Sequence, residues 1–387
     1  MRRFLKILGV VTLIVAALAV WKREEIVRLQ SVLTLFDADR ITGNFSHMDA
    51  AFLSTPLPKG DRPALPLPPG PAFDLPPETE GWITDRHVTA LVILKDGALR
   101  HEGYYLGTGA MDRRISWSVA KSFLSALLGT VVAEGAIDLD APVDQYAPAL
   151  LGSAYEGVTV RQVANMTSGV AFNEDYLDFW SDINKMGRVL ALGGSMDSFA
   201  AGIKTRSGPP GGAWHYVSID THILGMVIRG ATGRGIVDLM SERIVKPLGL
   251  EVEPYYLTDG YGQPFVLGGL NLITRDYARM GELFRREGRI DGQQIVPQDW
   301  VDASTRPQAD TPADGMGYGY QWWIPPQAEP GEFMAQGIYG QFIYVNRRAG
   351  VTIASNAADR GFTAAGVEDQ NVTMFRALVR ALEAADG

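Results

Sequence analysis

The chain has 387 residues, 46% of them hydrophobic and 20% charged, which suffices for a substantial core and excludes wholesale disorder. Its net charge of −9 argues against nucleic acid as a partner, because phosphate binding needs a basic surface. The lack of cysteine excludes disulfides, thiolate catalysis and cysteine-ligated metals, and the five histidines include no His-Glu-x-x-His pair. We therefore expect no metal and no organic cofactor.

Residues 1–23 differ in character from the rest of the chain. Basic residues precede a mostly apolar run at 7–20, and Trp21 with two cations follows it. This pattern is typical of a secretory signal peptide. The alternative is an uncleaved anchor that makes the membrane a partner, because tryptophan and cations suit a membrane interface. We expect a protein of the bacterial cell envelope, either periplasmic or held at the inner membrane by this segment.

Residues 24–80 are interpreted as an N-terminal extension. Nine of the chain's 22 prolines lie between Pro56 and Pro77. Such a segment favours extended backbone with few hydrogen bonds and is typical of a strap or spacer. We place the catalytic domain at 81–387.

Within that domain, strand patterns at 88–94 and 98–106 flank a turn at Lys95-Asp96-Gly97. Apolar residues then recur at helical spacing over 116–134, and Gly135 is a suitable end for that helix. Further helices are predicted at 160–166, 222–230, 236–245, 274–286 and 371–385, and a second hairpin joins strands at 340–346 and 351–355.

The predicted order is therefore strands, many helices, strands and a final helix. Strands at both ends must pair in one sheet if their backbone groups are to find partners. The helices between them form a second lobe, at roughly 136–300.

The sequence Ser118-Val-Ala-Lys121 is the main candidate for a catalytic site. A three-residue spacing on a helix brings the lysine nitrogen beside the serine hydroxyl one turn away. A lysine in a buried cleft has a lowered pKa and can take the serine proton. The alternative is an N-cap serine followed by an exposed lysine. Against it, this is the only Ser-x-x-Lys in the chain, and Lys121 interrupts an otherwise apolar helix.

Two further segments carry candidate residues. Tyr216, in Tyr216-Val-Ser218, is a phenol that can relay a proton to a leaving group; the alternative is a core tyrosine. Gly337 opens an apolar strand, and glycine in a strand often marks a close approach. If this is an edge strand, the Ile338 N–H forms an oxyanion hole with the Ser118 N–H; the alternative is a β-bulge or tight hairpin.

Together these segments resemble the serine β-lactamase and penicillin-binding-protein superfamily, in its class C-like branch. The resemblance is closest to the 6-aminohexanoate-dimer hydrolases and covers roughly residue 88 to the C-terminus. It rests on Ser118-Val-Ala-Lys121, Met166-Thr-Ser-Gly169 with Glu174-Asp175-Tyr176, Tyr216-Val-Ser218, Gly268-Gly-Leu-Asn271 and Gly337-Ile-Tyr-Gly340.

The resemblance implies an α+β fold, an antiparallel sheet flanked by helices with an all-helical second lobe and the cleft between them. It also implies substrate-binding roles for Tyr176, Ser218, Asn271 and Gly337. For Tyr176 and Asn271, a packed loop tyrosine and a helix-capping asparagine are the alternatives. We leave the aromatic residues Tyr318, Tyr320, Trp322 and Trp323 out of the site, because such clusters more often belong to a core.

One departure from the family pattern bears on the substrate. Ala335-Gln336 stands where the family's Lys-Thr-Gly motif has its lysine and threonine, and that lysine supplies a cation for a substrate carboxylate. We therefore expect a serine hydrolase that forms an acyl-enzyme at Ser118 and acts on a small amide or ester. The alternatives are a β-lactamase or D-Ala-D-Ala carboxypeptidase and, in another class, a non-catalytic envelope sensor. The sequence does not indicate whether the protein is a monomer or an oligomer.

Overall fold

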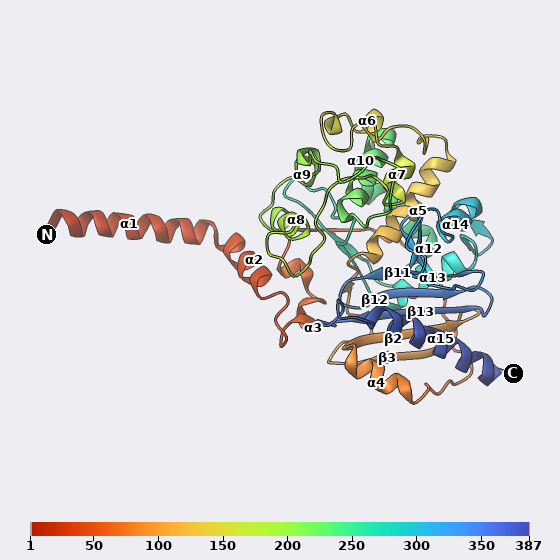
Figure 1. Cartoon of the computed structure of the whole chain (residues 1–387). Coiled ribbons are helices and arrows are strands. Elements are labelled where there is room, and N and C mark those ends of the chain that lie inside the picture. The colour runs from red at the N-terminus through yellow and green to blue at the C-terminus, as the bar shows by residue number, and fades with distance from the viewer. Residues whose placement is uncertain (1, 387) are drawn as a thin grey trace.

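The computed structural model describes residues 2–386, apart from the side chains at 2, 3, 10, 11, 15, 16, 18, 19, 24 and 25. The body of the protein has one lobe built on a seven-stranded sheet and a second lobe of short helices (Figure 1). The first helix projects away from both lobes, at the red end of the chain. The predicted α+β class is confirmed.

The large sheet joins both ends of the catalytic region, as predicted. Its order is β3-β2-β13-β12-β11-β10-β9, and every neighbouring pair is antiparallel. The strands are β2 (Val88–Lys95), β3 (Ala98–Tyr104), β9 (Gly317–Gly319), β10 (Trp322–Ile324), β11 (Glu332–Gly337), β12 (Gln341–Asn346) and β13 (Val351–Ala357).

Helices cover both faces of this sheet. Helix α13 (Thr274–Arg285) packs across β2, β12 and β13 on one face. On the other face, α4 (Glu78–Asp85) and α15 (Val367–Asp386) bury an aromatic layer in which Phe375 contacts Trp82 and Tyr344. Both faces are therefore shielded from water, which explains why β13 is buried along its whole length and why β2, buried up to its last residue, is almost entirely apolar.

Helix α5 (Val119–Ala133) carries the nucleophile candidate into the space between the lobes. Nearly all of its residues are buried, because the sheet, α10 (Ser218–Thr232) and α14 (Gln298–Ser304) surround it. Gly135 follows the helix at φ +76°, a left-handed conformation that glycine adopts without strain. The predicted start at Ser116 is early by three residues.

The remaining helices mostly belong to the second lobe and to the N-terminal region. Thr159 caps α7 (Val160–Ala164), as its position before the helix predicted. Its side chain accepts a hydrogen bond from the Gln162 N–H, and the Gln162 side chain accepts one from the Thr159 N–H. These elements are α1 (Arg2–Trp21), α2 (Arg23–Leu33), α3 (Ile41–Asn44), η1 (Met48–Ala50), α6 (Val143–Tyr146), η2 (Pro148–Leu150), α7 (Val160–Ala164), α8 (Asp182–Ala191), α9 (Met196–Gly202), α11 (Ile236–Met240), the π-helical turn η3 (Ser241–Val245) and α12 (Lys246–Leu248).

Short strands also lie within the region predicted to be all-helical. A small antiparallel sheet has the order β1-β5-β6-β4 and links that region to the N-terminal extension and to the segment before α5. A two-stranded hairpin follows α13. The strands are β1 (Ser54–Pro56), β4 (Arg114–Ile115), β5 (Tyr255–Leu257), β6 (Leu270–Leu272), β7 (Arg289–Ile290) and β8 (Gln293–Gln294).

The N-terminal extension packs into the body of the protein rather than spanning open space. Phe45 and Leu57 are fully buried, and Leu65 donates its N–H to the carbonyl oxygen of Gly249. The prolines fix an extended path, but the apolar residues between them fill the core. For the residues described, no helix combines the length and apolar character needed to cross a membrane.

The contact between α13 and the sheet leaves no room for a side chain at Gly281. A Cβ there would lie 2.6 Å from methyl carbons of Ile343 and Thr352. Gly281→Ala should therefore lower the free energy of unfolding by about 1–3 kcal/mol in chemical denaturation, through overpacking. Gly187→Ala in α8 is the control, because open space surrounds that site and alanine favours helix. Equal stability of both variants would contradict this packing.

Candidate active site

Ser118 directly precedes α5, and Lys121 lies one turn into the helix. Lys121 Nζ is 3.1 Å from Ser118 Oγ and 2.8 Å from the carbonyl oxygen of Leu267. Ser118 is partly exposed, whereas Lys121 is only 2% exposed. The Ser118 side chain makes no helix-capping hydrogen bond. A capping serine followed by an exposed lysine is therefore not what the structure contains.

Burial controls the charge of Lys121. It lowers the pKa of the amine to about 7, and the nearby carboxyl groups of Glu174 and Asp220 partly oppose this shift. Asp220 is itself fully buried, which raises its pKa to about 8 despite hydrogen bonds from Tyr155 and Ser168. Because burial favours the uncharged form of Asp220, Asp220 does less than Glu174 to hold Lys121 protonated. A large fraction of Lys121 can therefore accept a proton at neutral pH.

Tyr216 lies just before α10 and faces the same two residues. Lys121 Nζ is 5.4 Å from the centroid of its ring. Burial and the Glu174 charge raise the pKa of the phenol, while hydrogen bonding with Ser118 and Ser218 opposes the rise. The phenol therefore remains protonated at neutral pH and is placed to donate a proton.

Ser218 and Glu174 form the wall behind the amine. Ser218 Oγ accepts a hydrogen bond from Lys121 Nζ at 3.4 Å and donates one to Glu174 Oε2 at 3.2 Å. The Ser218 N–H and the Tyr176 hydroxyl also donate to the Glu174 carboxylate. Ser218 is 1% exposed and contacts these partners instead of the cavity. Substrate binding by Ser218 stays a prediction, while these hydrogen bonds place it to support Lys121 and Glu174.

Glu174 is a functional candidate that the sequence did not single out. It appeared only as part of the Glu174-Asp175-Tyr176 motif, and its loop lies 44 residues from Ser218 in the sequence. Burial raises the pKa of the Glu174 carboxyl, and Lys121 with the hydrogen bonds from Ser218 and Tyr176 opposes that rise.

Two backbone N–H groups near the nucleophile, those of Ser118 and Ile338, are the candidates for the predicted oxyanion hole. A Cβ at Gly337 would lie 3.0 Å from the Ser118 nitrogen and 2.7 Å from the Ser116 carbonyl oxygen, so only glycine allows this approach. Among the described residues, the N–H groups of Ser118 and Ile338 donate to no protein acceptor. Neither N–H is taken up by these residues, so both are left for a substrate oxygen, as an oxyanion hole requires.

The sequence predicted that Ile338 follows an edge strand, but the strand that leads to it, β11, lies inside the sheet. β11 lies between β12 and β10, and Gly337 ends it rather than opening the next strand. The Ile338 N–H is available because residues 338–340 form the hairpin turn to β12, where Tyr339 and Gly340 both have positive φ.

A cavity of about 290 Å³ opens onto these groups. Its lining includes the predicted residues Ser118, Tyr176, Tyr216, Gly337 and Ile338. Asn271 is absent from it: that side chain is fully buried on β6 and donates to the carbonyl oxygen of Gly269.

Trp323 is a second residue that the sequence analysis left out of the site. It lines the cavity and stacks on Tyr216, with ring centroids 5.3 Å apart. The other members of its cluster, Tyr318, Tyr320 and Trp322, are buried in the core as expected.

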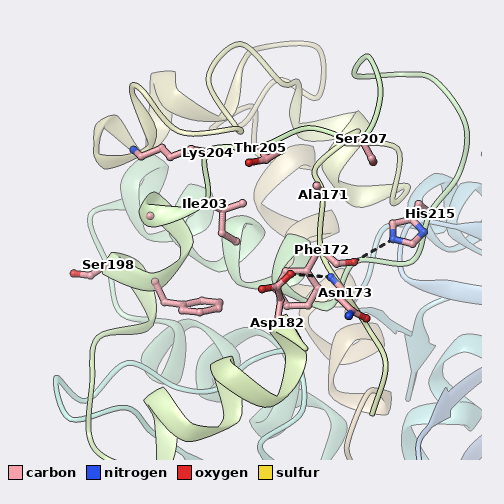
Figure 2. Close-up of a pocket in the computed structure, with 12 residues that line it drawn as sticks. Ala171, Phe172, Asn173, Asp182, Ser198, Ile203, Lys204, Thr205, Ser207 and His215 are labelled. Carbon is pink, nitrogen blue, oxygen red and sulfur yellow. Dashed lines mark hydrogen bonds between the residues drawn. The ribbon is translucent and has the colours of Figure 1, made fainter. Parts of the chain in front are cut away.

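A larger hollow of about 780 Å³ lies in the helical lobe and has a different character (Figure 2). His215 borders it, but the ring nitrogen Nε2 contacts the carbonyl oxygen of Phe172 at 3.3 Å rather than a carboxylate. Asp182 accepts a hydrogen bond from the Asn173 N–H and pairs with Lys185. This hollow therefore holds neither an activated serine nor a histidine–acid pair.

Comparison with known proteins places this geometry in a family. The Beta-lactamase family model matches residues 78–371. The chain belongs to this family. It is 30% identical over 321 residues to the 6-aminohexanoate-dimer hydrolase of Paenarthrobacter ureafaciens, with 79% of each protein covered. Esterase EstB of Burkholderia gladioli is 23% identical over 319 residues, which cover 64% of this chain and 78% of the esterase.

A solved structure agrees with this assignment. The structure of a Bacillus anthracis protein that is named as a candidate 6-aminohexanoate-dimer hydrolase superposes on this one with a TM-score of 0.80 at 25% sequence identity. The match covers 90% of this chain and 96% of that one. The predicted superfamily and its fold are confirmed, and the protein is a serine hydrolase with relatives named as a 6-aminohexanoate-dimer hydrolase and an esterase.

The Glu174 charge should be measurable through Lys121. It raises the pKa of Lys121, so Glu174→Gln should lower that pKa further. The acidic limb of the pH profile for inactivation by a neutral phosphonate should then move to lower pH. Asp175→Asn, at an exposed neighbouring carboxylate, should leave the profile in place. A shift to higher pH in Glu174→Gln would contradict this electrostatic arrangement.

Proposed function

We propose that the protein hydrolyses a small amide or ester through an acyl-enzyme at Ser118. The observation that carries the proposal is the 3.1 Å contact between a partly exposed hydroxyl and a buried amine with a pKa of about 7. A hydroxyl in this setting can lose its proton to the amine as it attacks a carbonyl carbon. The family relatives named as a hydrolase and an esterase support the same reaction class.

In the first step, Ser118 Oγ forms a bond to the carbonyl carbon and its proton passes to Lys121. The negative charge that develops on the carbonyl oxygen is stabilised by the N–H groups of Ser118 and Ile338. The bond to the leaving group then breaks, and the leaving nitrogen or oxygen receives a proton through the Tyr216 hydroxyl. Tyr216 is reprotonated from Lys121.

In the second step, water attacks the acyl carbon and gives up a proton to the same pair. The bond to Ser118 Oγ breaks, the serine regains its proton, and a carboxylic acid leaves. Glu174 and Ser218 take no part in bond making in this scheme. They hold the amine and Tyr176 in place through the hydrogen bonds described above.

The charges around the cavity support a substrate without a carboxylate near β11. Of the described residues that line it, the charged ones are Asp359 and Glu368. Asp359 pairs with Arg86 at 3.2 Å, whereas Glu368 is exposed and accepts a hydrogen bond from Gln336 at 2.9 Å. An anionic group beside Gln336 would meet Glu368 instead of a lysine. This disfavours β-lactams and peptides ending in a free carboxylate.

Removal of the nucleophile tests the reaction itself. Ser118→Ala should abolish turnover of short p-nitrophenyl esters and covalent labelling by a serine-directed phosphonate, because the described residues that line the cavity include no second serine. Ser198→Ala is the matched control, since that serine is exposed and borders the larger hollow. Full retention of turnover or labelling by Ser118→Ala would refute the proposal.

The substrate charge is tested with a matched pair of esters, p-nitrophenyl butyrate and the p-nitrophenyl monoester of glutaric acid. We expect the wild type to prefer the neutral ester. Glu368→Gln should narrow the ratio of kcat/KM values about two- to fivefold, the effect of one exposed charge pair. Asp369→Asn should not change it, because that neighbouring carboxylate does not line the cavity. Nitrocefin turnover as fast as ester turnover would favour a β-lactamase instead.

A further inference from the structure

An aromatic cluster outside the cavity joins the two segments that supply the oxyanion-hole N–H groups. The cluster consists of Phe36, Phe45, Trp117 and Tyr339. Trp117 precedes Ser118 in the sequence, and Tyr339 follows Ile338. Phe36 stacks on Tyr339 with ring centroids 5.1 Å apart and planes inclined by 13°.

Both phenylalanines contact both of the other rings. Phe36 lies 6.0 Å from Trp117, and Phe45 lies 5.6 Å from Trp117 and 5.4 Å from Tyr339. Trp117 and Tyr339 are themselves 6.1 Å apart. The two phenylalanines thus bridge residues that are 222 positions apart in the sequence but neighbours in space.

The bridged residues have costly backbone conformations. Trp117 has φ +42° and Tyr339 has φ +60°, in the left-handed region that bulky side chains rarely adopt. Such conformations persist only where the surrounding structure holds them. Each one directly adjoins a residue whose N–H points at the reacting carbonyl in the proposed mechanism. The ring contacts are therefore placed to fix the separation and direction of both N–H groups.

The segment that carries the two phenylalanines is also bonded to the strand leading into α5. The Ile115 N–H donates to the Phe45 carbonyl oxygen at 3.0 Å. The buried Arg114 donates to the Thr42 carbonyl oxygen at 2.6 Å and to Ser46 Oγ at 2.7 Å. These bonds keep the 36–46 segment in register with the nucleophile.

We propose that Phe36 and Phe45 are positioning residues for the oxyanion hole, so that the N-terminal extension completes the active site. Both lie before residue 78, where the match to the family model begins. The inference rests on the proposed function, because it assigns the Ser118 and Ile338 N–H groups to the reacting oxygen. Neither phenylalanine lines the cavity, so they act indirectly, through their ring contacts with Trp117 and Tyr339 and the backbone bond from Ile115 to Phe45.

Phe36 is the better site for a test, because it is 38% exposed whereas Phe45 is fully buried. Phe36→Ala removes the stacked ring, and Phe36→Leu keeps apolar contact without a ring, so at least one variant should fold. Phe36→Tyr keeps the stacking. Tyr261→Ala, at a ring that is 73% exposed, is the control for loss of a surface aromatic side chain.

The measurements are kcat and KM for p-nitrophenyl butyrate, the rate of phosphonate inactivation, and Tm. Misplacement of the N–H pair should lower kcat and the inactivation rate together, about 10- to 100-fold, because both steps form an oxyanion. KM should stay within about twofold of the wild-type value, because the two N–H groups bind the oxyanion more strongly than the carbonyl oxygen of the bound substrate. Phe36→Tyr and Tyr261→Ala should behave like the wild type.

Unchanged kcat in both Phe36→Ala and Phe36→Leu would overturn the inference. Losses that follow a fall in Tm and equally affect Tyr261→Ala would also overturn it, because they indicate general destabilisation. Failure of the proposed function is distinguishable, since Ser118→Ala would then retain the turnover of the wild type.

Discussion

The site depends on keeping one amine out of water beside a hydroxyl that water can reach. Lys121 is enclosed between α5, the start of α10 and the Leu267 carbonyl, and its desolvation lowers its pKa to about 7. If that amine were exposed, it would stay charged and could not take the proton of Ser118. The sheet, the helical lobe and the Glu174 loop can each be understood as parts of its enclosure.

The enclosure also contains two acidic residues, Glu174 and Asp220, whose negative charge would raise the pKa of Lys121. A fully charged pair at Glu174 and Asp220 would favour the protonated amine and remove the base. Burial favours the uncharged form of Asp220, and it raises the pKa of Glu174 as well. Ser218 and Tyr176 donate hydrogen bonds to the Glu174 carboxylate, so this group can be buried near Lys121 without being left unpaired.

Local patterns in the sequence predicted what local geometry determines. The Ser118–Lys121 contact follows from helical spacing, and the pairing of β2 with β13 follows from strands that need partners. The roles of Glu174 and Trp323 did not follow, because they depend on contacts across many residues. The packing of the proline-rich stretch did not follow for a similar reason: prolines indicate an extended path, but they do not reveal that Leu57, between Pro56 and Pro58, is fully buried.

The central claim is that Lys121 is substantially uncharged at neutral pH, and nuclear magnetic resonance can measure this directly. Lysines labelled with ¹³C at Cε would be titrated in the whole protein, with Lys121→Met identifying the signal. We expect one resonance with a midpoint near pH 7 that is missing in the variant. A Lys121 resonance that stays in its charged form up to the ordinary lysine pKa of 10.5 would contradict the account.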